Sequence, residues 1–438
     1  MINNKNKINR ETFFPIINLI KNKKYDKALD LLKDLTDKQI DLNFTNKLKG
    51  LIYLNKKNWK KSLLYYQKIS KEKLNFDTLN NMGVCLYKLG KFNEASDKFY
   101  QSINENNNFI SAYENFCVTN KLLGNFDLSI KYSSKALMMS PKNNKLKNNL
   151  LDILNFYEPK KISNSIININ NQIKKLNSVN NNKKFIQNTS LNKILNQSQS
   201  ILENNNLILN YPHTQIFKKN TTNLNCERHL AIFEEHKIIP KFCFSCFKVQ
   251  LTLNSVLDLI KLYFYFNNLN LKNNNIRKCI VELRDDVEGN FKGYIFSSSV
   301  NEAKNIKKII SEDLTNSEII IDKIEIKHGC TEYYNKFELY KNISEDIVNK
   351  IYDDKWENIE KEFDKKNFII ENNMERVFKE TINTFNLPDF LIIKNWLIYA
   401  KIIGDNSYQE IYESDLATNH LSQTELQKIN MRNKKLFN

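Results

Sequence analysis

Four soft metal ligands occur as two close pairs near the middle of the 438-residue chain. Cys226 and His229 form the first pair, and Cys243 and Cys246 form the second pair, with thirteen residues between the two pairs. Thiolates and imidazoles at such spacing can close the tetrahedral shell that zinc prefers. Because protein would fill all four positions, the ion would be structural, with no open position for water. We therefore expect one structural zinc ion at these residues.

The same cysteines allow other interpretations. Cys243 and Cys246 lie among Phe242, Phe244 and Phe247, so their thiols would also suit an apolar interior as small buried groups. A redox or iron–sulfur role is a third alternative. Further ligands occur nearby in the sequence or in the expected fold, namely His236, Cys279, His328 and Cys330.

No catalytic pattern stands out elsewhere in the sequence. The chain has no GxGxxG, GxxxxGK[ST] or GxSxG pattern, and only 8 glycines, which disfavours glycine-rich phosphate loops. Its 5 histidines form no HExxH or HxxEH pair. Asp285, Asp286 and Glu288 fall in an expected turn, where carboxylates commonly support the loop. An enzyme stays possible on these grounds, since catalytic geometry is spatial rather than sequential.

The first third of the chain contains an internal repeat. Small residues recur at spacings of 34, 33 and 34 residues, and an aromatic residue precedes each by three positions. The small residues are Ala28, Ser62, Ala95 and Ser129, and the aromatic residues are Tyr25, Trp59, Phe92 and Phe126. Gly90 and Gly124 mark the turns of the last two repeats, where Lys23 and Lys57 stand in the first two.

These residues resemble the tetratricopeptide repeat (TPR). A small side chain lets two antiparallel helices approach closely, and an aromatic residue fills the space in the neighbouring pair. The resemblance implies four helix pairs plus a capping helix in residues 1–158, and a concave groove that binds a peptide. By register, the groove positions are Arg10, Lys47, Asn80, Tyr87 and Lys121. Leu51 replaces an Asn that some members use to clamp a C-terminal carboxylate, so we expect no chaperone-tail receptor.

Positive charge is concentrated in this repeat region. The chain has a net charge of +17, and residues 1–150 hold 27 basic and 13 acidic side chains. Residues 213–438 hold 32 basic and 33 acidic side chains and are close to neutral. A basic surface attracts acidic peptides, nucleic acid or anionic lipid. We expect a protein or peptide partner with an acidic segment, and we give nucleic acid a lower rank.

The amino-acid composition changes twice in the rest of the chain, after residue 158 and after residue 212. Residues 159–212 are rich in Asn, Ser and Lys, as expected of polar helix fragments or of a partly disordered linker. Strand and helix patterns then alternate in residues 213–335. The expected strands are 247–251, 277–284, 293–298 and 318–327, and the expected helices are 255–266 and 300–311. This βαββαβ order predicts a ferredoxin-like α+β domain, followed by a helical region at 336–438.

One strand carries a weaker resemblance. Lys292, Gly293, Tyr294, Ile295 and Phe296 resemble the third strand of an RNA-recognition motif. Strand alternation places Tyr294 and Phe296 on one face, where such modules stack bases. The alternative is an ordinary aromatic strand face that other elements cover.

Taken together, the sequence predicts a multidomain adaptor or scaffold. The TPR groove binds a partner, and the α+β domain supplies a second function that includes the zinc site. The alternatives are an enzyme in the C-terminal region, which would need a pocket near Cys246, Glu282, Arg284 and His328, and then an RNA-binding module. No apolar signal segment or 18-residue apolar run is present, and the 7 cysteines are an odd number, so we expect a cytoplasmic protein without a membrane span.

Overall fold

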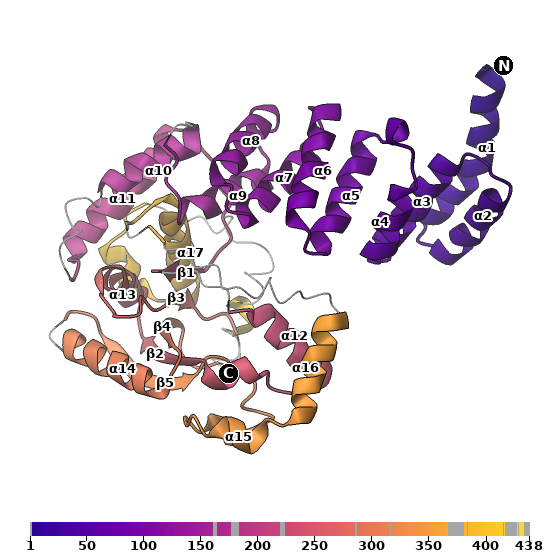
Figure 1. Ribbon diagram of the computed structural model, residues 1–438. Coiled ribbons are helices and arrows are strands. Elements are labelled where there is room, and N and C mark those ends of the chain that lie inside the picture. Colours follow the sequence, from indigo (N-terminus) through magenta and orange to yellow (C-terminus); the bar gives the residue numbers. More distant parts are fainter. Residues whose placement is uncertain are drawn as a thin grey trace. The chain divides into compact units, whose positions relative to one another are not determined.

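A computed structural model gives the fold of the chain (Figure 1). It divides into two compact units, Met1–Leu150 and Leu151–Asn438, and each is described by itself. For residues 2–11 only the backbone is described. The described residues are 2–438 without 161–163, 177–183, 220–223, 285–286, 316, 367–380, 383, 415, 417–426, 428 and 433–438.

Unit 1 consists of consecutive antiparallel helix pairs, coloured indigo to purple in Figure 1. The pairs are α1 (Ile2–Lys21) with α2 (Tyr25–Asp37), α3 (Leu42–Asn55) with α4 (Trp59–Gln67), α5 (Phe76–Lys88) with α6 (Phe92–Glu105), and α7 (Ile110–Leu122) with α8 (Phe126–Met139). A short 3-10 helix, η1 (Lys71–Lys73), precedes α5, and α9 (Asn144–Leu154) follows the last pair. The helices of each pair pack on each other and on the next pair.

Close contacts at small residues hold these helices together. A Cβ atom at Gly50 would lie 2.6 Å from the ring of Tyr66, and one at Gly83 would lie 2.5 Å from the ring of Phe99. The four small repeat residues of the second helices are all fully buried. Ser62 also donates a hydrogen bond to the carbonyl of Gly50 at 2.8 Å. Period and packing therefore confirm the TPR prediction for this part of the chain.

The turn inside each helix pair has the same backbone conformation. Lys23 and Lys57 have φ angles of 58° and 57°, while Gly90 and Gly124 have φ angles of 75° and 79°. A residue with a Cβ atom adopts this left-handed region at a cost. The two lysines therefore adopt the backbone conformation that glycine adopts in the last two pairs. The turn geometry is the same in all four pairs although the residue type differs.

Unit 2 contains one antiparallel sheet, as the sequence predicts. The strands are β1 (Gln215–Lys218), β2 (Phe247–Leu253), β3 (Arg277–Val281), β4 (Phe291–Ser297) and β5 (Ile321–His328), in the order β1-β3-β4-β2-β5. All neighbouring strands pair antiparallel. Helix α13 (Val256–Asn268) follows β2, and α14 (Val300–Leu314) joins β4 to β5. The edge strand β1 was not expected from the sequence.

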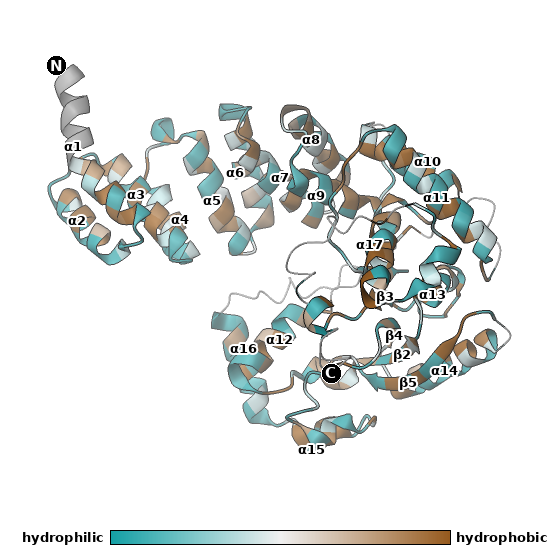
Figure 2. Cartoon of the chain, turned by 180° about the vertical axis from the view of Figure 1, so that it is seen from behind, coloured by the Kyte–Doolittle hydropathy of each residue, from teal (hydrophilic) through white to brown (hydrophobic). Residues whose placement is uncertain are grey.

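Where the structure describes them, the asparagine-rich residues after unit 1 form two helices, the first of the two alternatives expected from the sequence. Helices α10 (Ser165–Leu176) and α11 (Asn188–Asn204) pack on α17 (Leu387–Ile403), which is mainly brown in Figure 2. Isoleucines and leucines on one side of α10 and α11 are buried, while polar residues cover the other side. These helices belong to unit 2, so the two units meet between residues 150 and 151.

The remaining described elements surround the sheet and α17. They are α12 (Cys226–His236), η2 (Lys241–Ser245), η3 (Glu338–Lys341), α15 (Ile347–Ile351), α16 (Asp354–Lys366) and η5 (Asn406–Glu410). Although α17 is strongly apolar, none of the described helices has the length and hydrophobicity needed to cross a bilayer.

We predict that Gly83→Ala destabilises unit 1 by roughly 1–3 kcal/mol, because the added methyl group would overlap the ring of Phe99. Urea unfolding of the full chain, followed by circular dichroism, measures this loss. Combining Gly83→Ala with Phe99→Leu should restore part of the stability, since the smaller side chain makes room. Equal stability of Gly83→Ala and the unchanged chain would contradict the packing described here.

Candidate functional site

The first helices of the pairs form one continuous surface of unit 1. Helix α3 contacts α5, and α5 contacts α7. Contacts of that extent do not link α4 to α6 or α6 to α8 in the described part of the chain. Since the first helices lie closer to one another than the second helices do, they form the shorter, concave side of the array.

Polar side chains connect neighbouring first helices. Lys47 of α3 forms an ion pair with Asp77 of α5 at 3.3 Å. Asn115 of α7 donates a hydrogen bond to Asn80 of α5 at 2.9 Å. Lys145 of α9 pairs with Glu114 of α7 at 3.1 Å. These contacts fix the spacing of the repeats and already use part of the predicted binding surface.

The five predicted groove residues therefore differ in what they can offer a partner. Lys47 and Asn80 are engaged with the next repeat. Tyr87 and Lys121, 34 positions apart in α5 and α7, are half-buried, and the ring of Tyr87 packs edge-on against Phe92 at 5.3 Å. The side chain of Arg10, on α1, lies outside the described residues. Tyr87 and Lys121 share one repeat position on the first helices, so both are candidates for partner contacts.

The predicted zinc ligands lie around α12 and the start of β2. Cys226 is the first residue of α12, and Cys243 lies in η2, where its Sγ is 3.6 Å from the Tyr333 hydroxyl. The thiol of Cys330, after β5, interacts with the thiols of both Cys226 and Cys243. The ring of His229 stacks on Phe242. Residues distant in sequence thus bring three thiols together.

These thiols do not form a ready metal site in this structure. No group of three or more His, Cys, Asp and Glu side chains among the described residues is arranged to hold a metal ion. The pKa of the Cys226 thiol is raised, first by its hydrogen bond with Cys330 and then by burial, which favours the protonated thiol. The geometry as it stands suits neutral thiols.

The groups that an enzyme pocket would need are largely enclosed. His328 is fully buried between the rings of Phe247 and Tyr340, with centroid distances of 4.8 Å and 4.1 Å. Burial lowers the pKa of His328, although a hydrogen bond from its ring to the backbone carbonyl of Asn342 acts in the opposite direction. Tyr294, expected to stack RNA bases, is only 4% exposed. His328, for an enzyme, and Tyr294, for RNA binding, are therefore both closed to solvent in this structure.

A charged network lies beside the end of β3. Glu282 is buried and accepts hydrogen bonds from Arg284 at 2.9 Å and from Lys292 at 3.2 Å. Arg284 also pairs with the partly exposed Glu332 at 2.7 Å. Burial alone would raise the pKa of Glu282, but Arg284 and Lys292 hold it at about 2. Glu282 therefore stays ionised and fixes both cations.

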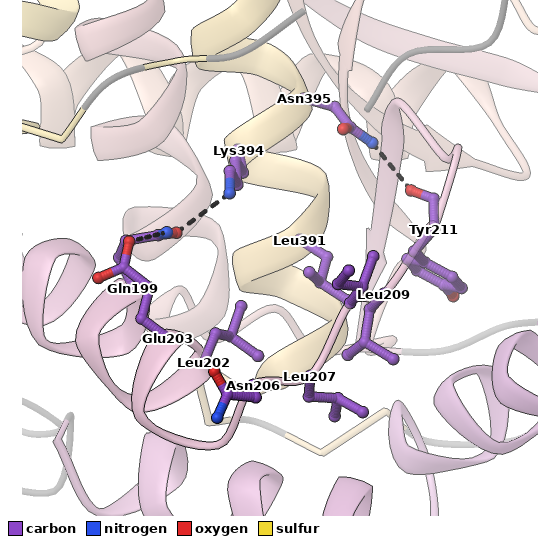
Figure 3. Close-up of a pocket in the computed structure, with 11 residues that line it drawn as sticks. Gln199, Leu202, Glu203, Asn206, Leu207, Leu209, Tyr211, Leu391, Lys394 and Asn395 are labelled. Carbon is purple, nitrogen blue, oxygen red and sulfur yellow. Dashed lines mark hydrogen bonds between the residues drawn. The ribbon is translucent and has the colours of Figure 1, made fainter. Parts of the chain in front are cut away.

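A separate pocket of about 490 Å³ lies between α11, α17 and residues 205–211 (Figure 3). Leu202, Leu209 and Leu391 form its apolar wall. Lys394 donates a hydrogen bond to Gln199 at 3.1 Å, and Gln199 in turn donates to a carboxylate oxygen of Glu203 at 2.6 Å. Because this polar chain is internally balanced, the pocket shows no preference for a charged ligand.

Comparisons with known proteins concern the helical repeats. No protein-family model matches the chain, and no curated protein matches its sequence. Among solved structures, MamA is similar at 15% identity over 31% of this chain and 79% of its own, with a TM-score of 0.29. The first TPR of Spaghetti (RPAP3), bound to an HSP90 peptide, is similar at 20% identity over 25% of this chain and 89% of its own, with a TM-score of 0.25. YrrB, a TPR protein with an unusual peptide-binding site, is similar at 14% identity over 44% of this chain and 85% of its own, with a TM-score of 0.31.

We predict that Glu282→Gln destabilises unit 2 by about 3 kcal/mol at neutral pH, because it leaves the buried ammonium of Lys292 unpaired. The pKa of Glu282 is about 2 in the folded chain and 4.5 for an unperturbed glutamate, so its contribution is complete above pH 4.5 and is lost as pH falls towards 2. The difference in free energy of unfolding between Glu282→Gln and the unchanged chain should therefore become smaller as pH falls from 4.5 towards 2.

Urea unfolding at a series of pH values measures this difference. Glu312→Gln is the control, since that carboxylate is exposed on α14 and forms only a long i,i+4 pair with Lys308. A Glu282→Gln effect that is independent of pH would contradict an ionic role for Glu282.

Proposed function

We propose that the chain is a protein-interaction scaffold whose repeats bind an extended segment of a protein partner. The surface formed by α3, α5 and α7 is the observation that carries this proposal. Tyr87 and Lys121 recur at the same repeat position on that surface, so a partner that follows the array would meet one after the other. An aromatic ring and an ammonium group suit a segment that mixes apolar and acidic residues.

The charge of unit 1 supports an acidic partner. Ion pairs such as Lys47 with Asp77 and Lys145 with Glu114 neutralise some cations within the array. Residues 1–150 hold 27 basic and 13 acidic side chains, so this part of the chain carries a net charge of +14. An acidic segment would be attracted at long range, and salt would weaken that attraction.

For unit 2 we propose a ferredoxin-like module as the second part of the scaffold. Its support is the order of β2, α13, β3, β4, α14 and β5, together with the antiparallel order β3-β4-β2-β5. Helices α10, α11 and α17 add a helical layer that the simple βαββαβ unit lacks. A cytoplasmic location remains part of the proposal, motivated by the odd number of cysteines.

Fluorescence anisotropy with a set of labelled acidic, neutral and basic peptides tests the interaction. We predict that the full chain binds acidic peptides best, and that Tyr87→Ala and Lys121→Ala each weaken binding roughly 10-fold. Lys131→Ala is the control, because it removes the same charge from an exposed position on the second helix α8. Equal losses for Lys121→Ala and Lys131→Ala would reduce the interaction to general charge. Binding that ignores added salt would remove the acidic part of the proposal.

Zinc at Cys226, His229, Cys243 and Cys246 stays a prediction, supported by the contacts that join Cys226 and Cys243 through Cys330. Elemental analysis of the purified full chain should find about one zinc ion per chain, and Cys246→Ser should lower that content. Cys117→Ala, a buried thiol change in unit 1, should leave it unchanged. A metal-free unchanged chain that is stably folded would favour the buried-thiol interpretation.

A further inference from the structure

One face of the sheet in unit 2 gathers cations around a single aromatic ring. Strand alternation places Gly293 and Tyr294 on opposite faces of β4. The Gly293 face meets Leu262 and Phe266 of α13. On the other face, the Nζ of Lys248, from β2, lies 4.9 Å from the Tyr294 ring centroid. The Nζ of Lys278, from β3, lies 5.9 Å from the same centroid.

The carboxylates near this face are already committed to other cations. Glu282 pairs with Arg284 and Lys292, and Glu332 pairs with Arg284. The Nζ of Lys248 donates its hydrogen bond to the carbonyl of Gly329 at 2.9 Å, which carries no net charge. In the described part of the chain, Lys248, Lys278, Arg284 and Lys292 thus share the carboxylates of Glu282 and Glu332, while Glu325 of β5 pairs with Lys323 and Lys327.

Lys278 lies near two aromatic rings. Its side chain is half-buried, and its contacts in the described part of the chain are the rings of Phe217 at 5.2 Å and Tyr294 at 5.9 Å. Burial and the charges of Lys248 and Arg284 together lower the pKa of Lys278 to about 8, although Cys226 and Glu282 act in the opposite direction. Holding like charges together in a partly buried place costs free energy unless an anion sits among them.

We propose that Lys248, Lys278 and Arg284 bind a small oxyanion of the phosphate class at the face of the sheet opposite α13, from the side where Lys278 and Arg284 reach solvent. The two ammonium groups, and the guanidinium N–H groups of Arg284 that its bonds to Glu282 and Glu332 leave over, can donate to different oxygens of a tetrahedral oxyanion. Arg284, with a side chain 43% exposed, and the half-buried Lys278 leave this site open to solvent. The ring of Tyr294 is 4% exposed and cannot stack on a base, so the ligand is a small phosphorylated molecule or phosphate itself rather than nucleic acid. This site is separate from the repeat surface proposed above.

Titration calorimetry of the full chain with inorganic phosphate, at constant ionic strength, tests the proposal. We expect saturable binding that Lys278→Met weakens at least about 10-fold, because the methionine keeps an unbranched side chain but removes the charge. Lys304→Met removes a lysine charge from an exposed position on α14 and should leave binding unchanged. Lys248→Met, at the other side of the ring, should weaken binding as Lys278→Met does.

Thermal unfolding gives a second readout that does not depend on calorimetry. Without phosphate, Lys278→Met should unfold at the same temperature as the unchanged chain or higher, since one of the repelling charges is gone. Phosphate should raise the unfolding temperature of the unchanged chain and of Lys304→Met but not that of Lys278→Met. The proposal is overturned if phosphate does not bind saturably, if Lys304→Met weakens binding as much as Lys278→Met, or if a single-stranded oligonucleotide binds this face while phosphate does not.

Discussion

Close approach at positions without a Cβ atom sets the spacing of elements in both units. In unit 1 the rings of Tyr66 and Phe99 occupy the space that side chains at Gly50 and Gly83 would need. In unit 2 the same constraint operates between a strand and a helix, where Gly293 lies beneath Leu262 of α13. Interiors pack too densely to absorb an extra methyl group at such points. The helix spacing in the repeats and the packing of α13 on the sheet therefore depend on glycine, which has no Cβ atom, at these positions.

That constraint also explains which parts of the fold could be predicted from the sequence. A repeat that fixes small and aromatic residues at constant spacing is visible without any long-range information. The strands from β2 to β5 were predictable because they are long enough to show alternation. Strand β1, with the four residues 215–218, is too short for such a pattern. In α10 and α11 a single apolar stripe is hidden among asparagines, and only its partner α17 reveals its role.

The candidate sites were harder to predict than the fold, because each depends on residues far apart in the chain. The TPR register correctly placed Lys47 and Asn80 on the first helices, but it could not show that Asp77 and Asn115 engage them. The paired spacing of Cys226 and Cys243 drew attention to the right region. Cys330 was only one of four further ligands in the sequence, and the return of β5 brings its thiol into interaction with those of Cys226 and Cys243.

Positive charge has different physical roles in the two units. In unit 1 much of it is on the surface, where salt screens it and where the proposed acidic partner would meet it. In unit 2 several cations are buried and need fixed counter-charges, as Lys218 shows by its 2.7 Å ion pair with Asp389, itself hydrogen-bonded to Tyr263. Lys278 departs from that rule, because its nearest described neighbours are aromatic rings. A salt whose ions do not bind the protein would therefore weaken the attraction of the proposed partner to unit 1. The same salt would have little effect on the buried ion pairs of unit 2. There, an anion has to enter the proposed site on the sheet face to compensate the excess positive charge.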